Sequence, residues 1–348
     1  MRAKSEQPLA GIVPKLLAWF DRSARTLPWR TAPGVRRDPY RVWLSEIMLQ
    51  QTTVPHAAPY FAAFTTRWPT VEALAAARDE DVMQAWAGLG YYARARNLLK
   101  CAREVAAQGG FPETESGLRT LPGIGPYTAG AIAALAFGER TPAVDGNAER
   151  VFARLLAIKE DWAAAKKRIA LLARDLVPAD RPGAFAEALM DIGATICTPR
   201  KPNCAICPVA AYCRALAEGE AERYPIKPEK IARPERFGTA YVLRRNGNVW
   251  LVRRPPSGLL GGMLALPSSE WSETRQHAAA PVDAEWEVLG EVRHVFTHFS
   301  LKLDVWSAKT PNTELPEGFW TSEDEIDGLP TVFAKAAALA GLSARRKR

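Results

Sequence analysis

Apolar residues in the first two thirds of the chain recur at helical spacing. Ile12, Leu16 and Phe20 form one such stripe, and Trp43 and Ile47 belong to another. Proline and glycine residues separate the stripes, and no long stretch of residues 10–220 alternates with a period of two. We therefore predict that residues 1–224 form an all-helical domain.

A proline-rich segment follows at residues 225–236 (PIKPEKIARPER), with alternating charges and a single isoleucine. A segment of this composition cannot bury a core, so we predict a semi-rigid linker. Beyond it, residues 239–245 and 248–254 are rich in β-forming residues. They are joined by Asn246-Gly247, which strongly predicts a type I′ hairpin.

The remaining pattern indicates a second, smaller domain. Leu301, Leu303 and Val305 alternate with polar residues and predict another strand, and residues 332–342 predict a helix. We therefore expect residues 237–348 to form an α+β domain, so that the whole chain is α followed by α+β.

Length and charge narrow the classes of function. The chain has 348 residues, which suits two domains, and its 46 Lys and Arg outnumber 38 Asp and Glu to give a net charge of +8. That balance favours an anionic partner. Residues 1–10 lack the apolar stretch of a signal peptide, and the most apolar window, residues 129–137, is too short to span a membrane.

Four of the five cysteines lie close together, spaced C-x6-C-x2-C-x5-C in a loop at residues 197–213; they are Cys197, Cys204, Cys207 and Cys213. Such crowding is wrong for a secreted disulfide framework and typical of a metal site in a reducing compartment. Four thiolates can hold a single zinc ion or an iron–sulfur cluster, and ligand type does not decide between them. Cys101, on an apolar helical run, is interpreted as a core residue.

Gly123 and Gly125 lie in a turn (LPGIGPYTAG, residues 121–130) that precedes an apolar helix. Such a turn can direct backbone N–H groups at a phosphate, although a tight turn between helices explains it equally well. With a basic chain and a four-cysteine site nearby, we predict a helix-hairpin-helix at about residues 118–132. This element would bind the DNA backbone without reading sequence.

Asp145 lies at the start of a predicted helix over residues 148–156. Its simplest role is that of a helix N-cap. Alternatively, its position near helix N-termini keeps the carboxylate ionised, so that it can stabilise a developing cation.

Several segments together closely resemble the adenine DNA glycosylase family. They are LPWR (residues 27–30), WLSEIMLQQT (43–52), GLGYYARARN (88–97), the glycine turn, VDGN (144–147) and the four cysteines. The resemblance covers nearly the whole chain. It implies a helix-hairpin-helix glycosylase with a [4Fe–4S] cluster that removes adenine mispaired with 8-oxoguanine, or with guanine, in double-stranded DNA. It is the resemblance, and not the spacing, that selects iron–sulfur over zinc.

The resemblance also implies catalytic roles. Glu46 matches the general acid that protonates adenine, Asp145 the carboxylate that shields the cationic sugar, and Asn147 a residue that orients this chemistry. Glu46 lies beside apolar residues whose desolvating effect would raise its pKa; outside this motif it would be interpreted as a solvated helix residue. Tyr127 replaces the Schiff-base lysine of bifunctional relatives, which predicts base removal without strand cleavage.

A base inside a duplex must be flipped out before it can react. The resemblance implies that Gln51 and Tyr91 are wedges in the DNA, with Leu89 in the same loop as Tyr91. It further implies that Arg25, Trp29, Arg30, Gln50 and Glu187 contact the adenine or the DNA. The alternative interpretations are core packing for Trp29 and a surface ion pair between Arg25 and Glu187.

The second domain resembles Nudix hydrolases through residues 251–262 (LVRRPPSGLLGG). The metal-binding Nudix helix is missing, because residues 268–281 carry only Glu270 and Glu273, so we expect recognition and no hydrolysis. Phe296, Thr297 and His298 match the family's Phe-Ser-His loop, which senses 8-oxoguanine, with threonine in place of serine. Without the match, His298 would be interpreted as a strand histidine.

Two other functions compete with this one. An endonuclease III-like glycosylase/lyase for oxidised pyrimidines is disfavoured by Tyr127 and by the second domain. An architectural DNA-binding module with a structural metal gives no reason for having Glu46 and Asp145 together. We expect a monomer that is associated with DNA in the bacterial cytoplasm and binds no membrane.

Overall fold

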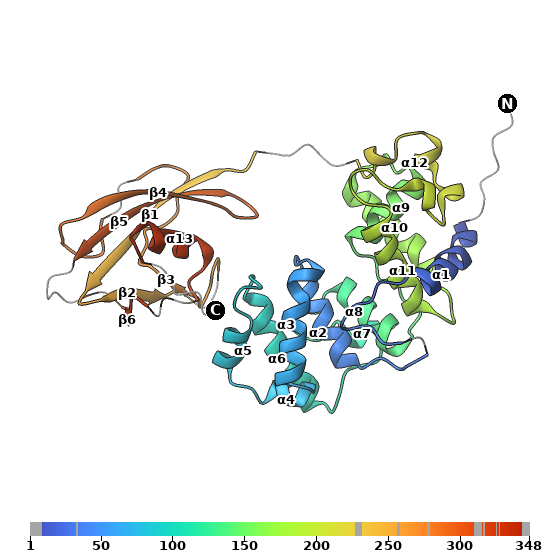
Figure 1. The fold of residues 1–348 in the computed structure, drawn as a ribbon, viewed down its shortest axis with the longest axis horizontal. Coiled ribbons are helices and arrows are strands. Elements are labelled where there is room, and N and C mark those ends of the chain that lie inside the picture. Colours follow the sequence, from blue (N-terminus) through green and yellow to red (C-terminus); the bar gives the residue numbers. More distant parts are fainter. Residues whose placement is uncertain are drawn as a thin grey trace. The chain divides into compact units, whose positions relative to one another are not determined.

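A computed structural model gives the fold of the chain, which divides into two compact units, Met1–Glu229 and Lys230–Arg348 (Figure 1). The residues that the structure describes are 9–32, 34–226, 232–255, 258–276, 279–309, 315, 317–324, 326 and 328–342. Residues 227–231 of the predicted linker, and the residues 1–8 that bear on a signal peptide, lie outside these ranges. In the described part of the chain, no helix is long and apolar enough to cross a membrane.

The first unit is helical, as predicted, and one of its cores is built around Trp43, Phe61, Phe64 and Trp86, all of which are buried. These side chains lie at helical spacing on amphipathic segments, so packing their apolar faces together removes a large area from water. The helices are α2 (Pro39–Leu49), α3 (Val54–Arg67), α4 (Val71–Ala75), α5 (Asp79–Ala85), α6 (Ala93–Ala107), α7 (Glu115–Leu118) and α8 (Pro126–Ile132), which continues as η2 (Ala133–Phe137).

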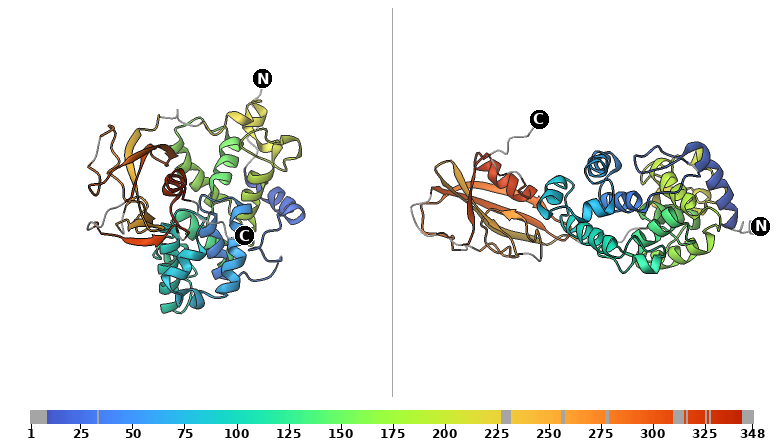
Figure 2. Two further views of the ribbon diagram at one scale, coloured as in Figure 1. Left: turned by 60° about the vertical axis from the view of Figure 1, so that its left-hand side comes forward. Right: turned by 90° about the horizontal axis from the view of Figure 1, so that it is seen from below.

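A second core joins the two ends of this unit. It contains Leu16, Phe152, Ile169 and Ile192, and its helices are α1 (Ile12–Ser23), α9 (Gly146–Leu156), α10 (Trp162–Leu176), α11 (Pro182–Thr195) and α12 (Arg214–Ala217). Helix α1 packs against α11, far along the chain, as both views in Figure 2 show. The segment between α1 and α2 therefore passes from one core to the other. Short helical turns η1 (Leu9–Gly11), η3 (Cys204–Ile206), η4 (Ala210–Tyr212) and η5 (Ala221–Arg223) complete the unit.

In its described residues, the second unit is a mixed sheet with one helix against it, which confirms the predicted α+β class. The strands run in the order β3-β2-β1-β5-β4, and β6 pairs with β2. Strands β1 and β5 are parallel and the other pairs are antiparallel. The bounds are β1 (Glu235–Arg245), β2 (Asn248–Arg253), β3 (Leu264–Ala265), β4 (Glu287–Val295), β5 (Ser300–Lys309), β6 (Phe319–Ser322) and helix α13 (Thr331–Leu339).

The predicted hairpin and strand are confirmed. Asn246 and Gly247 have φ angles of 49° and 74°, as a type I′ turn requires. Leu301, Leu303 and Val305 are buried together with Phe333 of α13. The predicted end of the linker is wrong by two residues: β1 begins at Glu235, because Glu235 and the next residue already pair with β5.

The segment between β3 and β4 has no helix among its described residues, which leave out residues 277–278. It instead follows the sheet, where Ser268 bridges to Ala240 and Ser272 bridges to Phe237.

Candidate active site

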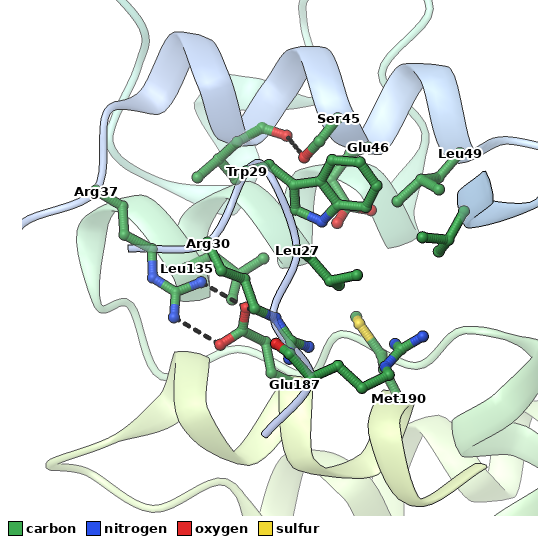
Figure 3. Close-up of a pocket in the computed structure, with 13 residues that line it drawn as sticks. Leu27, Trp29, Arg30, Arg37, Ser45, Glu46, Leu49, Leu135, Glu187 and Met190 are labelled. Carbon is green, nitrogen blue, oxygen red and sulfur yellow. Dashed lines mark hydrogen bonds and ion pairs between the residues drawn. The ribbon is translucent and has the colours of Figure 1, made fainter. Parts of the chain in front are cut away.

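A pocket of about 50 Å³ lies in the helical unit, between α2 and α11 (Figure 3). The segment that connects α1 to α2 supplies part of its wall, and in Figure 3 Glu46 lies on the α2 side and Glu187 on the α11 side. The pocket brings together five residues predicted at the site, although they span positions 25 to 187; they are Arg25, Trp29, Arg30, Glu46 and Glu187. Trp29 agrees with both interpretations given for it, as a residue of the pocket and as a core residue. It lines the pocket, and its ring also packs edge-on against Phe61, with centroids 5.5 Å apart.

Glu46 is 7% exposed and lies on α2 between the buried Trp43 and Ile47. Burial raises the pKa of its carboxyl group to about 7; the charges of Asp145 and Glu187 add to the rise, while a hydrogen bond with Tyr127 opposes it. A carboxyl group with this pKa carries its proton at neutral pH in a substantial fraction of the molecules. Glu46 is therefore able to act as an acid.

Tyr127 lies close enough to both candidate catalytic carboxyl groups to feel their charges. It is the second residue of α8, and its side chain is hydrogen-bonded to Glu46. Burial, with the charges of Glu46 and Asp145, holds the pKa of the phenol well above its ordinary value. The phenol stays neutral, and its hydroxyl group can donate a hydrogen bond to Glu46.

Asp145 is the N-cap of α9, so the simplest interpretation of this residue is confirmed. Its Oδ1 accepts hydrogen bonds from the backbone N–H groups of Asn147 (3.0 Å) and Ala148 (2.8 Å), and its Oδ2 accepts from Asn147 Nδ2 (2.7 Å). A Cβ atom at Gly193 would lie 2.6 Å from Asn147 Cβ, so this glycine is needed for α9 and α11 to meet here. The cap holds the carboxylate in one orientation.

Arg150 links this cap to the cysteine loop. Its Nη2 donates to Asn147 Oδ1 (2.9 Å) and to the Gly193 carbonyl (2.6 Å), and its Nε donates to the Cys197 carbonyl (2.8 Å). The Arg150 side chain therefore joins Asn147, which is hydrogen-bonded to Asp145, to Cys197, the first predicted metal ligand.

The predicted surface ion pair between Arg25 and Glu187 is wrong. Arg25 Nε instead contacts Asp191 Oδ1 at 2.6 Å, because Asp191 lies one helical turn further along α11 and closer to the end of α1. Glu187 is bound by Arg37 through two hydrogen bonds of 2.7 and 2.6 Å, and Arg30 Nε lies 2.9 Å from its Oε1. Both acids are buried, so neither pair lies on the surface.

Asp191 and Arg37 were missed by the sequence analysis. Asp191 is fully buried and binds Arg30 through hydrogen bonds of 2.7 and 2.8 Å. Burial alone would raise its pKa, but the hydrogen bonds and charges of Arg30 and Arg25 outweigh it and lower the pKa. The sequence does contain a signal for this residue: Glu187 and Asp191 are four residues apart on an otherwise apolar helix.

The two expected wedge residues are both exposed. Gln51 and Tyr91 have φ angles of 57° and 49°, and Tyr91 is 54% exposed. Leu89 differs, since it is 5% exposed and packs in the core of the first unit. The structure thus places Leu89 beneath the loop and not at its surface. The side chain of Gln50 is directed at α8, where its Nε2 lies 3.4 Å from Thr128 Oγ1.

The turn before α8 has the geometry expected of a backbone-binding hairpin. Gly123 has a φ of 76°, and a Cβ atom there would lie 2.8 Å from Asn97 Cβ, so this position requires glycine. Gly125 is the N-cap of α8, and a Cβ atom there would meet nothing within 4 Å. This side of the turn is open to a ligand.

The four clustered cysteines line one pocket beside Arg154. Burial raises the pKa of Cys207 to about 11, and the other three cysteines add to the rise, so all four thiols lie near one another. Among the described residues, however, no three His, Cys, Asp or Glu side chains are grouped closely enough to hold one metal ion. The four sulfur atoms that line this pocket are ligands suited to zinc or to an iron–sulfur cluster.

In the second unit, Phe296, Thr297 and His298 form the turn between β4 and β5. The turn is closed by a 2.8 Å hydrogen bond from the Phe296 N–H group to the Phe299 carbonyl. Phe296 packs against Trp271, with ring centroids 5.5 Å apart, whereas Thr297 and His298 are exposed. The interpretation of His298 as a strand histidine is therefore wrong.

Family models match three segments of the chain. Residues 44–179 match the HhH-GPD superfamily of base excision DNA repair proteins, residues 197–213 the iron–sulfur binding domain of endonuclease III, and residues 238–339 the NUDIX domain. Among solved structures, a thermostable thymine-DNA glycosylase is 30% identical, covers 60% of this chain and 96% of its own, and has a TM-score of 0.54. Endonuclease III trapped on DNA has the same fold, with a TM-score of 0.51 at 22% identity, over 62% of this chain and 99% of its own.

Two relatives that match most of the chain are both adenine DNA glycosylases. Adenine DNA glycosylase of Homo sapiens is 36% identical over 89% of this chain and 70% of its own length. The enzyme of Rattus norvegicus is 37% identical over 89% and 74%, respectively. The chain belongs to the adenine DNA glycosylase family: it is a DNA glycosylase of base excision repair, with an iron–sulfur binding loop and a Nudix-like second unit.

Proposed function

We propose that this chain hydrolyses the N-glycosidic bond of adenine mispaired with 8-oxoguanine, and less well of adenine mispaired with guanine, in double-stranded DNA. One observation carries the proposal: Glu46, with a pKa of about 7, and Asp145, held by three hydrogen bonds, both lie near Tyr127. A glycosidic bond is cleaved by such a pair when one carboxyl group supplies a proton and the other faces the developing cation.

The first step belongs to Glu46. Its carboxyl group gives a proton to N7 of the flipped adenine, so that the electron pair of the C1′–N9 bond can leave with the base. The base departs as neutral adenine, and positive charge develops on the sugar. Because only the protonated acid can do this, the raised pKa of Glu46 suits it to work near neutral pH.

The second step belongs to Asp145. Its oxygens are fixed by Asn147 and Ala148, so the negative charge is oriented before the cation forms. Water then adds to C1′, and the carboxylate left on Glu46 can accept the water proton, which restores the starting state. Asn147 is itself held by Arg150 and acts as a positioning residue.

We further propose that the chain is monofunctional. A phenol cannot form a Schiff base with the sugar, so Tyr127 leaves an abasic site and free adenine. Borohydride should therefore trap no covalent adduct with substrate DNA. Efficient trapping, with release of oxidised pyrimidines, would instead support the endonuclease III-like alternative.

The four cysteines would hold a [4Fe–4S] cluster, whose role is to fix the loop at residues 197–213 for contact with DNA. Arg154 supports this loop from α9: its Nη1 lies 3.3 Å from Cys197 Sγ and 2.7 Å from the Thr198 carbonyl. Analysis for iron and sulfide tests the cluster type, since four of each per chain are expected and zinc is not.

In the second unit, we propose that Thr297 and His298 contact the 8-oxoguanine opposite the adenine. They lie at an exposed turn that is held by the packing of Phe296, so they can reach a ligand without unfolding the sheet. The unit recognises this base and hydrolyses nothing. One chain carries both tasks, and we propose that it acts as a monomer.

Release of adenine from defined duplexes tests the whole proposal. The wild-type chain should release adenine from A·8-oxoguanine fastest, from A·G more slowly, and from A·T not measurably. Equal rates on A·T and A·8-oxoguanine would contradict it, as would binding of all three duplexes without release, which is what an architectural DNA-binding module would show.

A further inference from the structure

The two proposed wedges lie on separate loops that share one anchor. Gln51 follows the end of α2, and Tyr91 precedes α6, so they are 40 positions apart in the chain. Both have left-handed backbone angles, which L side chains adopt rarely. A surrounding structure that fixes both loops is needed to keep such conformations populated.

Arg94, the second residue of α6, supplies those contacts. At the end of α2 and in the loop that follows it, Arg94 Nη1 contacts the carbonyl oxygens of Ile47 (3.0 Å), Met48 (3.2 Å) and Gln50 (2.6 Å). Its Nη2 lies 3.3 Å from Thr52 Oγ1. These four acceptors flank Gln51 on both sides.

The same guanidinium also binds the second loop. Its Nη2 contacts the carbonyl oxygens of Leu89 (2.9 Å) and Gly90 (3.2 Å), the two residues before Tyr91. The Arg94 guanidinium carbon lies 5.5 Å from the centre of the Tyr91 ring and 5.3 Å from that of Trp86. One planar cation thus connects both loops and one of the wedge side chains.

We infer that Arg94 is a positioning residue that presents both wedges to the DNA as one rigid pair. This inference rests on the proposed function of Gln51 and Tyr91. Arginine suits the role because its planar fork satisfies acceptors on two loops at once, whereas the compact ammonium group of lysine cannot span them. Extruding a base costs a few kcal/mol, and loops that must first be ordered would add to that cost.

The effect can be measured apart from the chemistry. In a Glu46→Gln background, which stops proton transfer, 2-aminopurine placed next to the mispaired adenine brightens when the adenine leaves the stack. Arg94→Met should lower the extruded fraction among bound duplexes by roughly tenfold, while the affinity for an undamaged duplex changes less. Arg94→Lys keeps the charge and should recover only part of the signal.

Arg103→Met is the matched control. Arg103 lies on the same helix and also binds loop carbonyl oxygens, those of Ala75 (3.3 Å) and Ala77 (3.2 Å), together with Asp79, but it touches neither wedge loop. It should lower the melting temperature without changing the extruded fraction.

A full rise in fluorescence with Arg94→Met, or with Arg94→Lys if the methionine variant does not fold, would overturn the inference. The inference is also overturned if Arg94→Met lowers the melting temperature but leaves the extruded fraction unchanged. Failure of the proposed function gives a different result, because the wild-type chain would then release no adenine from an A·8-oxoguanine duplex.

Discussion

Glu46 shows how much of a residue's chemistry follows from its neighbours in the sequence. The apolar Trp43 and Ile47 already indicate desolvation, and burial does raise the pKa of Glu46 to about 7. The sequence neighbours of Asp191, Arg37 and Arg94 do not reveal which groups these residues bind. Their partners are 150 or more positions away for the first two and lie on two separate loops for the third. Such pairings are decided by tertiary packing and not by local pattern.

The pKa of Glu46 predicts how adenine release depends on pH. The acid must be protonated, so the single-turnover rate should be level well below about pH 7 and fall about tenfold per pH unit above it. Glu46→Gln should lose roughly 10²–10⁴-fold in rate, and its residual rate should not show this decrease. Rates measured from about pH 5 to pH 9 test this, and an unchanged pH profile in Glu46→Gln would contradict the assignment of the acid.

The buried acid Asp191 should matter for stability more than an exposed acid in a similar pair. Asp191→Asn leaves two arginines without their shared partner, so we expect the free energy of unfolding of the helical unit to fall by roughly 3–5 kcal/mol. Asp21 pairs with Arg181 but is 47% exposed, so Asp21→Asn should cost less than about 1 kcal/mol. Urea unfolding of both variants compares them directly, and equal losses would mean that burial has no influence on these pairs.

At the scale of elements, local sequence patterns are sufficient to predict a strand or hairpin that is formed by residues close together in the chain. Asn246-Gly247 predicted its hairpin, and the alternation of Leu301, Leu303 and Val305 predicted β5. Local patterns are not sufficient to predict the bounds of a strand that pairs with a distant segment. Strand β1 starts at Glu235 only because β5 lies beside it. Leu89 is a related case: Tyr91 in the same loop is exposed, but the Leu89 side chain is buried in the core.

The hairpin before α8 allows a prediction about DNA binding. Gly123→Ala should weaken binding to any duplex, damaged or not, because the residue needs a positive φ and its Cβ atom would meet Asn97. Gly109→Ala is the control, since Gly109 has a φ of 82° in open space. It should cost roughly 1–2 kcal/mol of stability with no loss of DNA affinity. Equal affinities of the two variants for undamaged DNA would exclude the hairpin as a binding element.

At the scale of the whole molecule, we propose that catalysis belongs to the helical unit and recognition of 8-oxoguanine to the Nudix-like unit. The sequence indicated this division through the change from helical to alternating pattern and through the missing Nudix helix. The sequence could not show that Thr297 and His298 lie at an exposed turn, because three residues in a row do not distinguish a turn from the end of a strand.

This division predicts separate effects on two substrates. The double variant Thr297→Ala, His298→Ala should bring the rate on A·8-oxoguanine down to that on A·G and leave the A·G rate unchanged. The control Glu270→Gln, Glu273→Gln should change neither rate, because these two exposed acids are not expected to hold a metal. A control with reduced activity would reveal a metal-dependent role for the second unit, and equal loss on both substrates would contradict its role in recognition.

The central claim is that Asp145 stabilises the sugar cation while Glu46 protonates the base. Its most direct test is Asp145→Asn, because asparagine is as good an N-cap as aspartate and should leave α9 folded. Mispair affinity and single-turnover adenine release are then measured on the same A·8-oxoguanine duplex. The account predicts that affinity is retained while release falls by at least about 10³-fold. Adenine release at the wild-type rate would contradict it.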